Sequence, residues 1–432
     1  MEKMALLIRG GRVVDPLLGL DGSFDILIEE GCISGVAPGI EKEGVPILEA
    51  QGKVVVPGLI DMHVHLRDFS EAHKETIATG TMAAALGGFT TVICEPNTDP
   101  PMDNCRVLKR WFRMAKRDGC VNLYTKVCIT KGRRGERLTR LKALFRRPWV
   151  VAATDDGDPV VRDKVMERAF LKAREYELLL TPHCEESPAT IQAFKRNNPL
   201  FPLPKEIARY RREPYYVARE LELAERVNRR VHISHVSMEA SLDLVRKAKG
   251  RGLQATCEAT PHHLTLSEEE AARCGTDAKV NPPLRKKEDV EALRQGLRDG
   301  TVDVIASDHA PHTPEEKARG WDQAPLGVIG LETTLGVVLT ALVHPGVITL
   351  SEAIERMSTN PARILGLPGG SLAVGTPADI TIIDMDKEWV VDPQSFCSKG
   401  RNTPFKDWQL KGKAYATIVG GKVVMEGGKV FV

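Results

Sequence analysis

The chain has 432 residues, of which 42% are hydrophobic, and its 60 basic and 58 acidic residues give a formal net charge of +2. A chain of this length can bury a large core, and so balanced a charge gives no reason to expect nucleic acid or an anionic membrane as a partner. No stretch offers about 18 consecutive apolar residues, the length that a membrane-spanning helix requires.

The N-terminal region reads as short strands separated by glycine-containing turns. Strand-like runs occur at residues 5–8, 13–14 and 25–28, and similar runs return near the C-terminus at 378–383 and 416–419. Chain ends often lie close together in folded domains. We therefore predict a small composite β-sandwich that is built from both chain ends, residues 1–56 and residues 368–432.

The middle of the chain alternates strand-like runs with longer helix-like segments. Eight such runs are found, at residues 54–65, 90–94, 122–129, 150–154, 178–183, 231–235, 253–258 and 302–307. Eight strand–helix units are typical of a closed parallel barrel. The predicted fold is thus α/β, with a (β/α)8 TIM barrel over residues 57–367.

The strongest local signal for chemistry is the run Asp61-Met62-His63-Val64-His65, at the end of the first strand candidate. Alternate residues of a strand point to the same face, so His63 and His65 are predicted to point the same way. Imidazole nitrogen is the commonest protein ligand for zinc-like ions. One His-x-His pair can arise by chance, so it indicates a metal site only weakly.

Further metal-ligand side chains end other strand candidates. They are Asp155-Asp156, His183, His235 and Asp308. Parallel barrels carry their active sites at the carboxyl ends of the strands, where these groups would meet. Four imidazoles and two carboxylates could hold two divalent ions there.

The expected roles follow from coordination needs. One ion would use His63, His65 and Asp308, and a second would use His183 and His235. Asp156 is the candidate for a carboxylate that bridges both ions. The nucleophile would then be a metal-activated hydroxide, with Asp308 as general base and proton donor to the leaving nitrogen.

At these residues the sequence resembles the amidohydrolase superfamily and, more closely, the long-chain class I bacterial dihydroorotases. The resemblance covers nearly the whole chain and rests on several separate motifs. They are His63-Val64-His65-Leu66-Arg67-Asp68, Pro96-Asn97-Thr98-Asp99-Pro100-Pro101, Asp155-Asp156-Gly157, His183-Cys184-Glu185, Val280-Asn281-Pro282-Pro283-Leu284-Arg285, Ser307-Asp308-His309-Ala310-Pro311-His312 and Arg401-Asn402-Thr403-Pro404-Phe405.

The resemblance implies an enzyme that reversibly cyclises N-carbamoyl-L-aspartate to L-dihydroorotate in pyrimidine synthesis. It implies one or two divalent ions per subunit, with zinc expected, and it favours Asp156 over Asp155 as the bridging ligand. It also implies a homo-oligomer that can associate with aspartate transcarbamoylase.

The resemblance further implies five substrate-binding residues. Arg67, Asn97 and His312 match the groups that hold the substrate α-carboxylate, which suits the fork geometry of a guanidinium. Asn281 matches a contact to the ring amide, and Gly327 matches a backbone contact to the ring.

Two departures from the family pattern bear on the assignment. Many relatives place Pro-Gly where this chain has Phe69-Ser70, which affects the loop that carries Arg67. Many relatives in the wider group bridge their metals with a carbamylated lysine at the fourth strand, which here ends in Thr154-Asp155-Asp156. The missing lysine disfavours a hydantoinase or allantoinase activity.

Two alternatives stay open at this stage. Another cyclic-amide hydrolase, such as a dihydropyrimidinase or hydantoinase, would act on a neutral ring and would not need a carboxylate pocket. A non-catalytic scaffold of the same fold would be expected to have lost metal ligands, whereas all six candidates are present here.

The remaining features receive structural interpretations. His232, His262, His263 and His309 are expected to be structural, and the pairs Arg133-Arg134 and Arg211-Arg212 are expected on the solvated surface. The charged loop at 312–326 has no strand pattern, and both a mobile flap and disorder are left open. Nine scattered cysteines without a Cys-x-x-Cys pair favour reduced thiols in a cytoplasmic protein.

Overall fold

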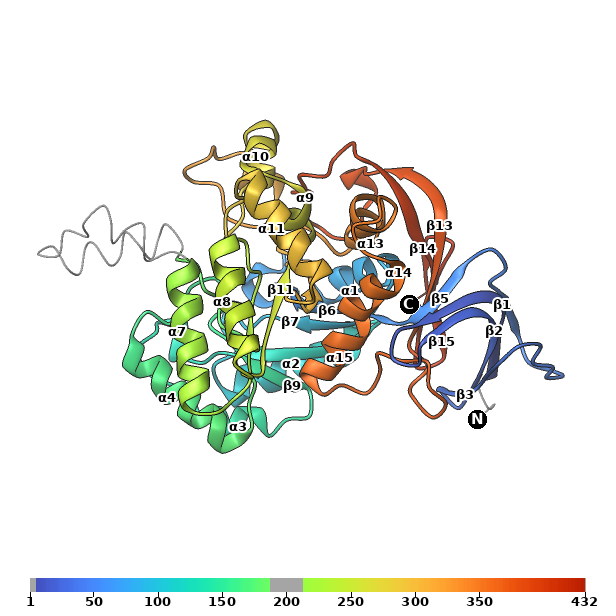
Figure 1. The fold of residues 1–432 in the computed structure, drawn as a ribbon, viewed down its shortest axis with the longest axis horizontal. Coiled ribbons are helices and arrows are strands. Elements are labelled where there is room, and N and C mark those ends of the chain that lie inside the picture. Colours follow the sequence, from blue (N-terminus) through green and yellow to red (C-terminus); the bar gives the residue numbers. More distant parts are fainter. Residues whose placement is uncertain (1–4, 187–212, 432) are drawn as a thin grey trace, which may run out of the picture.

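The buried strands of the middle region form a parallel barrel (Figure 1). Parallel bridges from Leu180 to Ala153 and to Val231 join its two strand groups on one side, and a bridge between Val64 and His309 closes it on the other. The strands, in order, are β6 (Leu59–Val64), β7 (Phe89–Cys94), β8 (Asn122–Val127), β9 (Val150–Ala153), β10 (Val231–Ile233), β11 (Ala255–Ala259) and β12 (Val304–Ile305). With the Leu180 position they supply the eight strands of a TIM barrel, so this part of the predicted fold is confirmed.

The computed structural model describes residues 5–186 and 213–431. Helices surround the barrel, and in the described ranges no helix combines the length and apolarity needed to cross a bilayer. The helices are α1 (Ile77–Leu86), α2 (Cys105–Asp118), α3 (Leu141–Phe145), α4 (Asp163–Tyr176), α7 (Glu213–Arg226), α8 (Glu239–Gly250), α9 (Pro261–Thr265), α10 (Glu268–Cys274), α11 (Lys287–Arg298), α12 (Pro314–Lys317), α13 (Thr334–Val338), α14 (Leu350–Ile354) and α15 (Asn360–Leu365).

Helix α2 shows how the sequence specifies these elements. The Asn104 side chain caps its first turn by accepting from the backbone N–H groups of Arg106 and Val107, at 3.0 and 3.1 Å. Leu108, Trp111 and Ala115 recur at helical spacing and are its buried residues. The helix therefore has one apolar face, which packs on the barrel.

Strands from both chain ends form one nine-stranded sheet beside the barrel, where Figure 1 shows blue and red strands side by side. Its path runs β16-β15-β14-β13-β5-β1-β2-β3, and β4 pairs with β1. The bounds are β1 (Ala5–Asp15), β2 (Leu20–Glu29), β3 (Cys32–Ala37), β4 (Ile47–Glu49), β5 (Val54–Pro57), β13 (Ile380–Val390), β14 (Gln409–Val419), β15 (Lys422–Glu426) and β16 (Lys429–Val430). The predicted composite domain is thus present, with its own apolar core of Ile, Val and Leu side chains; its exact boundaries stay a prediction.

Two strand predictions were wrong in detail. The run at 54–65 is not one strand, because β5 pairs with β1 and β13 in the terminal sheet while β6 begins the barrel at Leu59. An uninterrupted apolar run does not reveal that the chain changes sheets within it. The run at 178–183 contributes only isolated bridges at Leu180 rather than a six-residue strand.

Gly58 lies between β5 and β6, where there is no room for a side chain. A Cβ atom at this position would lie 2.2 Å from Oγ1 of Thr90, whereas one at Gly250, at the exposed end of α8, would meet nothing within 4 Å. We predict that Gly58→Ala lowers the free energy of unfolding by about 1–3 kcal/mol, the usual cost of overpacking a filled site. Gly250→Ala is the matched control, and urea unfolding followed by circular dichroism measures both. Equal stability of the two variants would contradict the prediction.

Candidate active site

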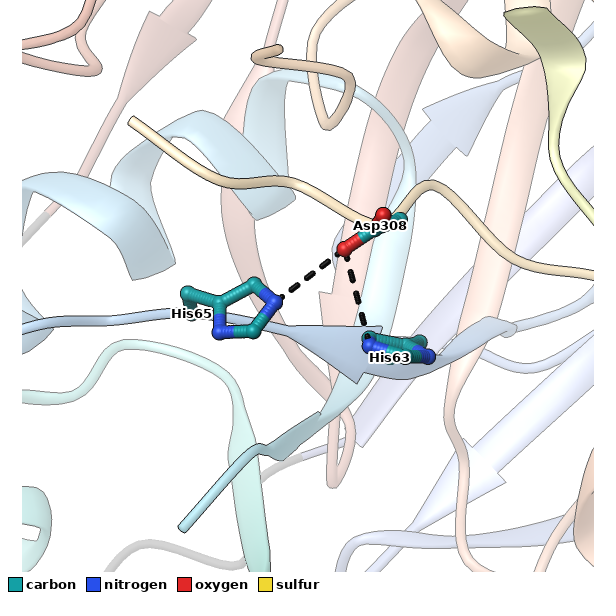
Figure 2. A group of neighbouring side chains, drawn as sticks. All are labelled: His63, His65 and Asp308. Carbon is teal, nitrogen blue, oxygen red and sulfur yellow. Dashed lines mark hydrogen bonds and ion pairs between the residues drawn. The ribbon is translucent and has the colours of Figure 1, made fainter. Parts of the chain in front are cut away.

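His63 and His65 point to the same side of β6, as predicted, and the Asp308 carboxylate lies over both rings (Figure 2). Oδ1 of Asp308 is 3.1 Å from Nε2 of His65 and 3.5 Å from Nε2 of His63. Asp308 follows β12 and has φ 48°, a backbone conformation that side-chain-bearing residues seldom adopt. This unusual backbone turns the carboxylate into the mouth of the barrel.

Asp156 brings the remaining predicted ligands to the same place. Its Oδ1 lies 3.3 Å from Nε2 of His63, 3.5 Å from Nδ1 of His183 and 3.7 Å from Nε2 of His235. Its Oδ2 is 3.6 Å from Nε2 of His65. One carboxylate thus faces all four imidazoles, as a bridging ligand would.

The donor set fits a metal ion. Nε2 of His63 and Oδ1 of Asp156 are buried and have no hydrogen-bond partner among the residues that the structure describes, although buried polar atoms are nearly always paired. Two groups of three ligand atoms lie within 4.8 Å of one another, His63 with His65 and Asp308, and His63 with Asp156 and His235. Imidazole and carboxylate together suit zinc and similar divalent ions.

Glu258 fixes the orientation of His63. Its Oε1 lies 2.6 Å from Nδ1 of His63, and the carboxylate also binds Nε2 of His232 at 3.1 Å and the backbone N–H of His235 at 3.2 Å. A proton held on Nδ1 leaves the Nε2 lone pair free for a metal. Burial alone would raise the pKa of Glu258, but His63 and His232 lower it well below its usual range.

Glu258 is not among the predicted site residues, although the sequence carries a signal for it. Glu258 ends the seventh strand candidate, so the rule that selected His183 and Asp308 applied to it as well. The structural role predicted for His232 agrees with its bonds to Glu258 and to Thr256, at 3.1 and 2.8 Å.

Two more buried acidic groups support the site and were also missed. Asp61 accepts from the N–H of His63 at 3.1 Å and of Ser307 at 3.2 Å, which ties β6 to the segment before Asp308. Burial raises the pKa of Asp61 to about 7. Glu95 forms a fully buried ion pair with Lys126 of β8, and its Oε1 lies 3.7 Å from Nε2 of His63.

Asp155 points away from the site. It accepts from the backbone N–H of Thr130 at 3.0 Å and from the Thr130 hydroxyl. The predicted surface position of Arg133 was wrong, because this side chain is partly buried and donates to the backbone carbonyl of Asp156. The second pair, Arg211-Arg212, lies outside the described residues.

The residues predicted to hold the substrate α-carboxylate differ in whether their polar atoms already bond to predicted metal ligands. Arg67 is buried, and its Nη2 lies 3.2 Å from Nε2 of His312 at the pocket wall. Burial lowers the pKa of Arg67. Asn97 instead links two predicted ligands, with Oδ1 2.8 Å from Nδ1 of His65 and Nδ2 3.1 Å from Oδ2 of Asp156.

The loop that carries Arg67 takes its shape from several contacts. Arg67, Asp68 and Phe69 all have positive φ, between 49° and 55°. The Asp68 carboxylate accepts from the N–H of Ile77 at 2.7 Å, and the Ser70 hydroxyl donates to the Asp99 carbonyl at 2.9 Å. With Phe69-Ser70 in place of Pro-Gly, this loop still directs the guanidinium into the pocket.

Two lysines form hydrogen bonds to backbone carbonyls of the segment between His312 and Gly327. It begins with helix α12, and Nζ of Lys317 donates to the carbonyls of Pro325 and Gly327, at 3.1 and 3.0 Å. Nζ of Lys279 donates to the Ala324 carbonyl at 2.6 Å. The segment thus contains a short helix and returns to the pocket at Leu326 and Gly327.

The predicted site residues converge on one pocket. Asn281 also reaches it, and its Nδ2 donates to Nε2 of His183 at 2.9 Å. Ten of the eleven predicted residues line the pocket, and His63 lies beneath it. The lining is His65, Arg67, Asn97, Asp156, Gly157, His183, His235, Asn281, Asp308, Ala310, His312, Leu326 and Gly327.

Three other histidines lie close to this pocket without lining it. His263 binds the Pro282 carbonyl at 3.0 Å, and Nε2 of His309 lies 3.3 Å from Glu75, so both have the structural surroundings that were expected. His262 is buried, its Nε2 has no partner within residues 5–186 and 213–431, and burial lowers its pKa to about 4. A neutral ring is therefore expected at His262.

A parallel barrel with imidazoles and carboxylates at its strand ends defines a metal-dependent hydrolase. The chain belongs to the amidohydrolase family, whose sequence profile matches residues 54–424. Its relatives include proteins named dihydroorotase from Pelotomaculum thermopropionicum, 47% identical over 98% of this chain and 99% of theirs, and from Acetivibrio thermocellus, 43% identical over 97% and 99%. The resemblance to the dihydroorotases is thereby confirmed.

Solved structures agree on the fold. The L-hydantoinase (dihydropyrimidinase) of Arthrobacter aurescens superposes with a TM-score of 0.88 at 27% identity, covering 99% of this chain and 97% of that one. A D-hydantoinase gives 0.87 at 22% identity, covering 99% and 96%, which bears on the fold alone.

Glu258→Gln tests the support beneath His63. The amide cannot accept from both imidazoles as the carboxylate does, so we predict that metal affinity falls about tenfold to a hundredfold. Glu213→Gln is the control, because Glu213 is equally buried and binds the N–H of Ser237 at 3.0 Å. Titration with a chelator measures metal retention. Equal retention in both variants would refute the orienting role.

Proposed function

We propose that the chain is a dihydroorotase, which reversibly closes N-carbamoyl-L-aspartate into L-dihydroorotate. The observation that carries this proposal is the pairing of one pocket wall, formed by buried Arg67 and His312, with the ligand cluster at the pocket floor. A carboxylate-bearing ring would present its anion to the wall and its scissile amide to the cluster. The full-length likeness to proteins named dihydroorotase supports the same substrate.

The wall would bind and orient the substrate. The Arg67 guanidinium can grip the α-carboxylate by two parallel hydrogen bonds, and the His312 ring stands beside it. Asn97 would reach the same carboxylate through Nδ2, which now faces Asp156. Asn281 and the backbone of Gly327 would contact the ring from the other side.

His63, His65 and Asp308 would hold one ion, and His183 and His235 a second, with Asp156 shared between them; we propose zinc. A divalent ion bound there supplies Lewis acidity and lowers the pKa of water. Hydrogen bonds within the chain prepare the ligands for it. The side-chain oxygen of Asn97 accepts from Nδ1 of His65 and so keeps the proton on that nitrogen, as Glu258 does for His63.

Asp308 would move the proton. In the hydrolytic direction it would accept a proton from the attacking water and pass it to the ring nitrogen as the carbon–nitrogen bond breaks. In the direction of ring closure it would take that proton back from the carbamoyl nitrogen. Burial would raise the pKa of Asp308, but His63 and His65 lower it, so the group is held as an ionised carboxylate.

A dihydropyrimidinase or hydantoinase activity is the second candidate, and the likeness to the Arthrobacter aurescens L-hydantoinase structure favours it. Such an enzyme would open a neutral ring, which would leave the Arg67 charge unpaired in a buried wall. A non-catalytic scaffold is disfavoured because all six ligand side chains converge. On the family resemblance alone, we also propose a cytoplasmic homo-oligomer that can associate with aspartate transcarbamoylase.

Substrate preference tests the function. Zinc-loaded protein is expected to hydrolyse dihydroorotate with a kcat/KM at least about a hundredfold above that for neutral dihydrouracil, since a buried guanidinium left unpaired is costly. Arg67→Met should shrink this ratio, mainly through a higher KM for dihydroorotate. Removing metal with a chelator should abolish turnover, and adding zinc should restore it. Preference of the wild-type protein for dihydrouracil would overturn the assignment.

Asp308→Ala separates proton transfer from binding. We predict a fall in kcat of at least about a thousandfold, because the base and one metal ligand are both removed. Dihydroorotate binding should persist through Arg67 and His312, measured by calorimetry on the folded variant. Substantial turnover by this variant would show that another group is the base.

A further inference from the structure

The connection between β13 and β14 leaves the terminal sheet and lies against the barrel. Ser398 donates to the Glu75 carboxylate, and the N–H of Cys397 donates to Glu332 at 2.9 Å. A Cβ on Gly400 would come within 2.6 Å of Ile329 and 2.8 Å of Pro311. The sheet domain therefore contributes a tightly packed strip of chain to the rim of the barrel.

Asn402 is the residue of this strip that reaches the site. Its Nδ2 donates to the carbonyls of Ala310 and Gly327, at 3.0 and 2.9 Å, and its Oδ1 accepts from the N–H of His312 at 3.1 Å. Its backbone carbonyl accepts from the N–H of Ile329 at 2.8 Å. The side chain is only 2% exposed, and its amide makes these three bonds with backbone groups alone.

These bonds join two separate pocket segments. Ala310 and His312 follow Asp308, whereas Gly327 belongs to the far end of the loop that Lys317 holds down. The two segments also touch directly, through the N–H of Ala310 and the Val328 carbonyl at 2.7 Å. Asn402 adds a second link, from Gly327 to Ala310 and His312, which all line the pocket.

Only a carboxamide can make this link. It offers two N–H donors and an acceptor from one short side chain, while a carboxylate has no donor and a hydroxyl has one. An aspartate here could still accept from His312, but it would place negative charge against two carbonyl oxygens. Aspartate, the nearest isostere of asparagine, therefore cannot replace the two bonds that Nδ2 of Asn402 donates.

We propose that Asn402 is a positioning residue that fixes the spacing between the His312 segment and the Gly327 segment, and so sets the fit of the substrate. This inference rests on the proposed function, because the substrate is the one named there. It gives the terminal sheet domain a part in substrate recognition, through one side chain that touches no ligand itself.

Steady-state kinetics with dihydroorotate on zinc-loaded Asn402→Asp and Asn402→Ala test the inference. We expect KM to rise about tenfold or more, the effect of losing one or two buried hydrogen bonds, with a much smaller change in kcat because Asp308 is not bonded to Asn402. Thr403→Val is the matched control, since Thr403 is equally buried in the same strip and its hydroxyl accepts only locally, from the N–H of Phe405 at 3.2 Å. It should lower the unfolding temperature without raising KM.

Hydrogen exchange distinguishes a failure of this inference from a failure of the proposed function. In Asn402→Asp, peptides covering 309–328 should exchange faster than in the wild type, whether or not dihydroorotate is the substrate. Unchanged exchange, or an unchanged KM in an active enzyme, would overturn the inference and leave the proposed function standing. If the wild-type protein does not hydrolyse dihydroorotate, and exchange in Asn402→Asp is still faster, the proposed function is overturned. The role of Asn402 in joining the two segments then stands. An equal rise of KM in Thr403→Val would also overturn the inference, since the effect would then be general loosening.

Discussion

The site depends on charge balance around the buried imidazole of His63. Glu258 binds one edge of the ring, and Asp156 and Asp308 face the other. An ionised group in a protein interior is stable only with partners, so each of these residues requires the others. The carboxylates raise the pKa of His63 well above its usual value against the opposing effect of burial.

The sequence predicted the ligands because a simple geometric rule applies to them. Carboxyl ends of parallel strands meet at one end of a barrel, so side chains far apart in the chain, such as His63 and Asp308, had to be neighbours if the strands were identified correctly. The rule says nothing about partners inside the barrel wall. Nothing in the sequence distinguishes Lys126 of β8, which forms a buried ion pair with Glu95 beneath the site.

The position at which the chain passes from one sheet to the other was harder to predict than the existence of the two sheets. The boundary at Gly58 interrupts neither hydrophobicity nor strand propensity, because both sheets bury the residues on each side of it. Loop shapes were equally hidden. The ordered path from His312 to Gly327 depends on Lys279 and Lys317, whose bonds to backbone carbonyls leave no pattern in the sequence. Shared architecture with hydantoinases likewise says little about substrate, which such loops decide.

The joining of both chain ends in one sheet has a consequence for biosynthesis. Nζ of Lys53 meets Oδ2 of Asp384 at 2.9 Å although the two residues are 331 positions apart. Strands β1–β5 leave the ribosome long before β13 exists, with an unpaired edge that can recruit other chains. The nascent polypeptide must therefore keep this edge soluble while the barrel forms, and a product that terminates early would be a ready substrate for chaperones and proteases.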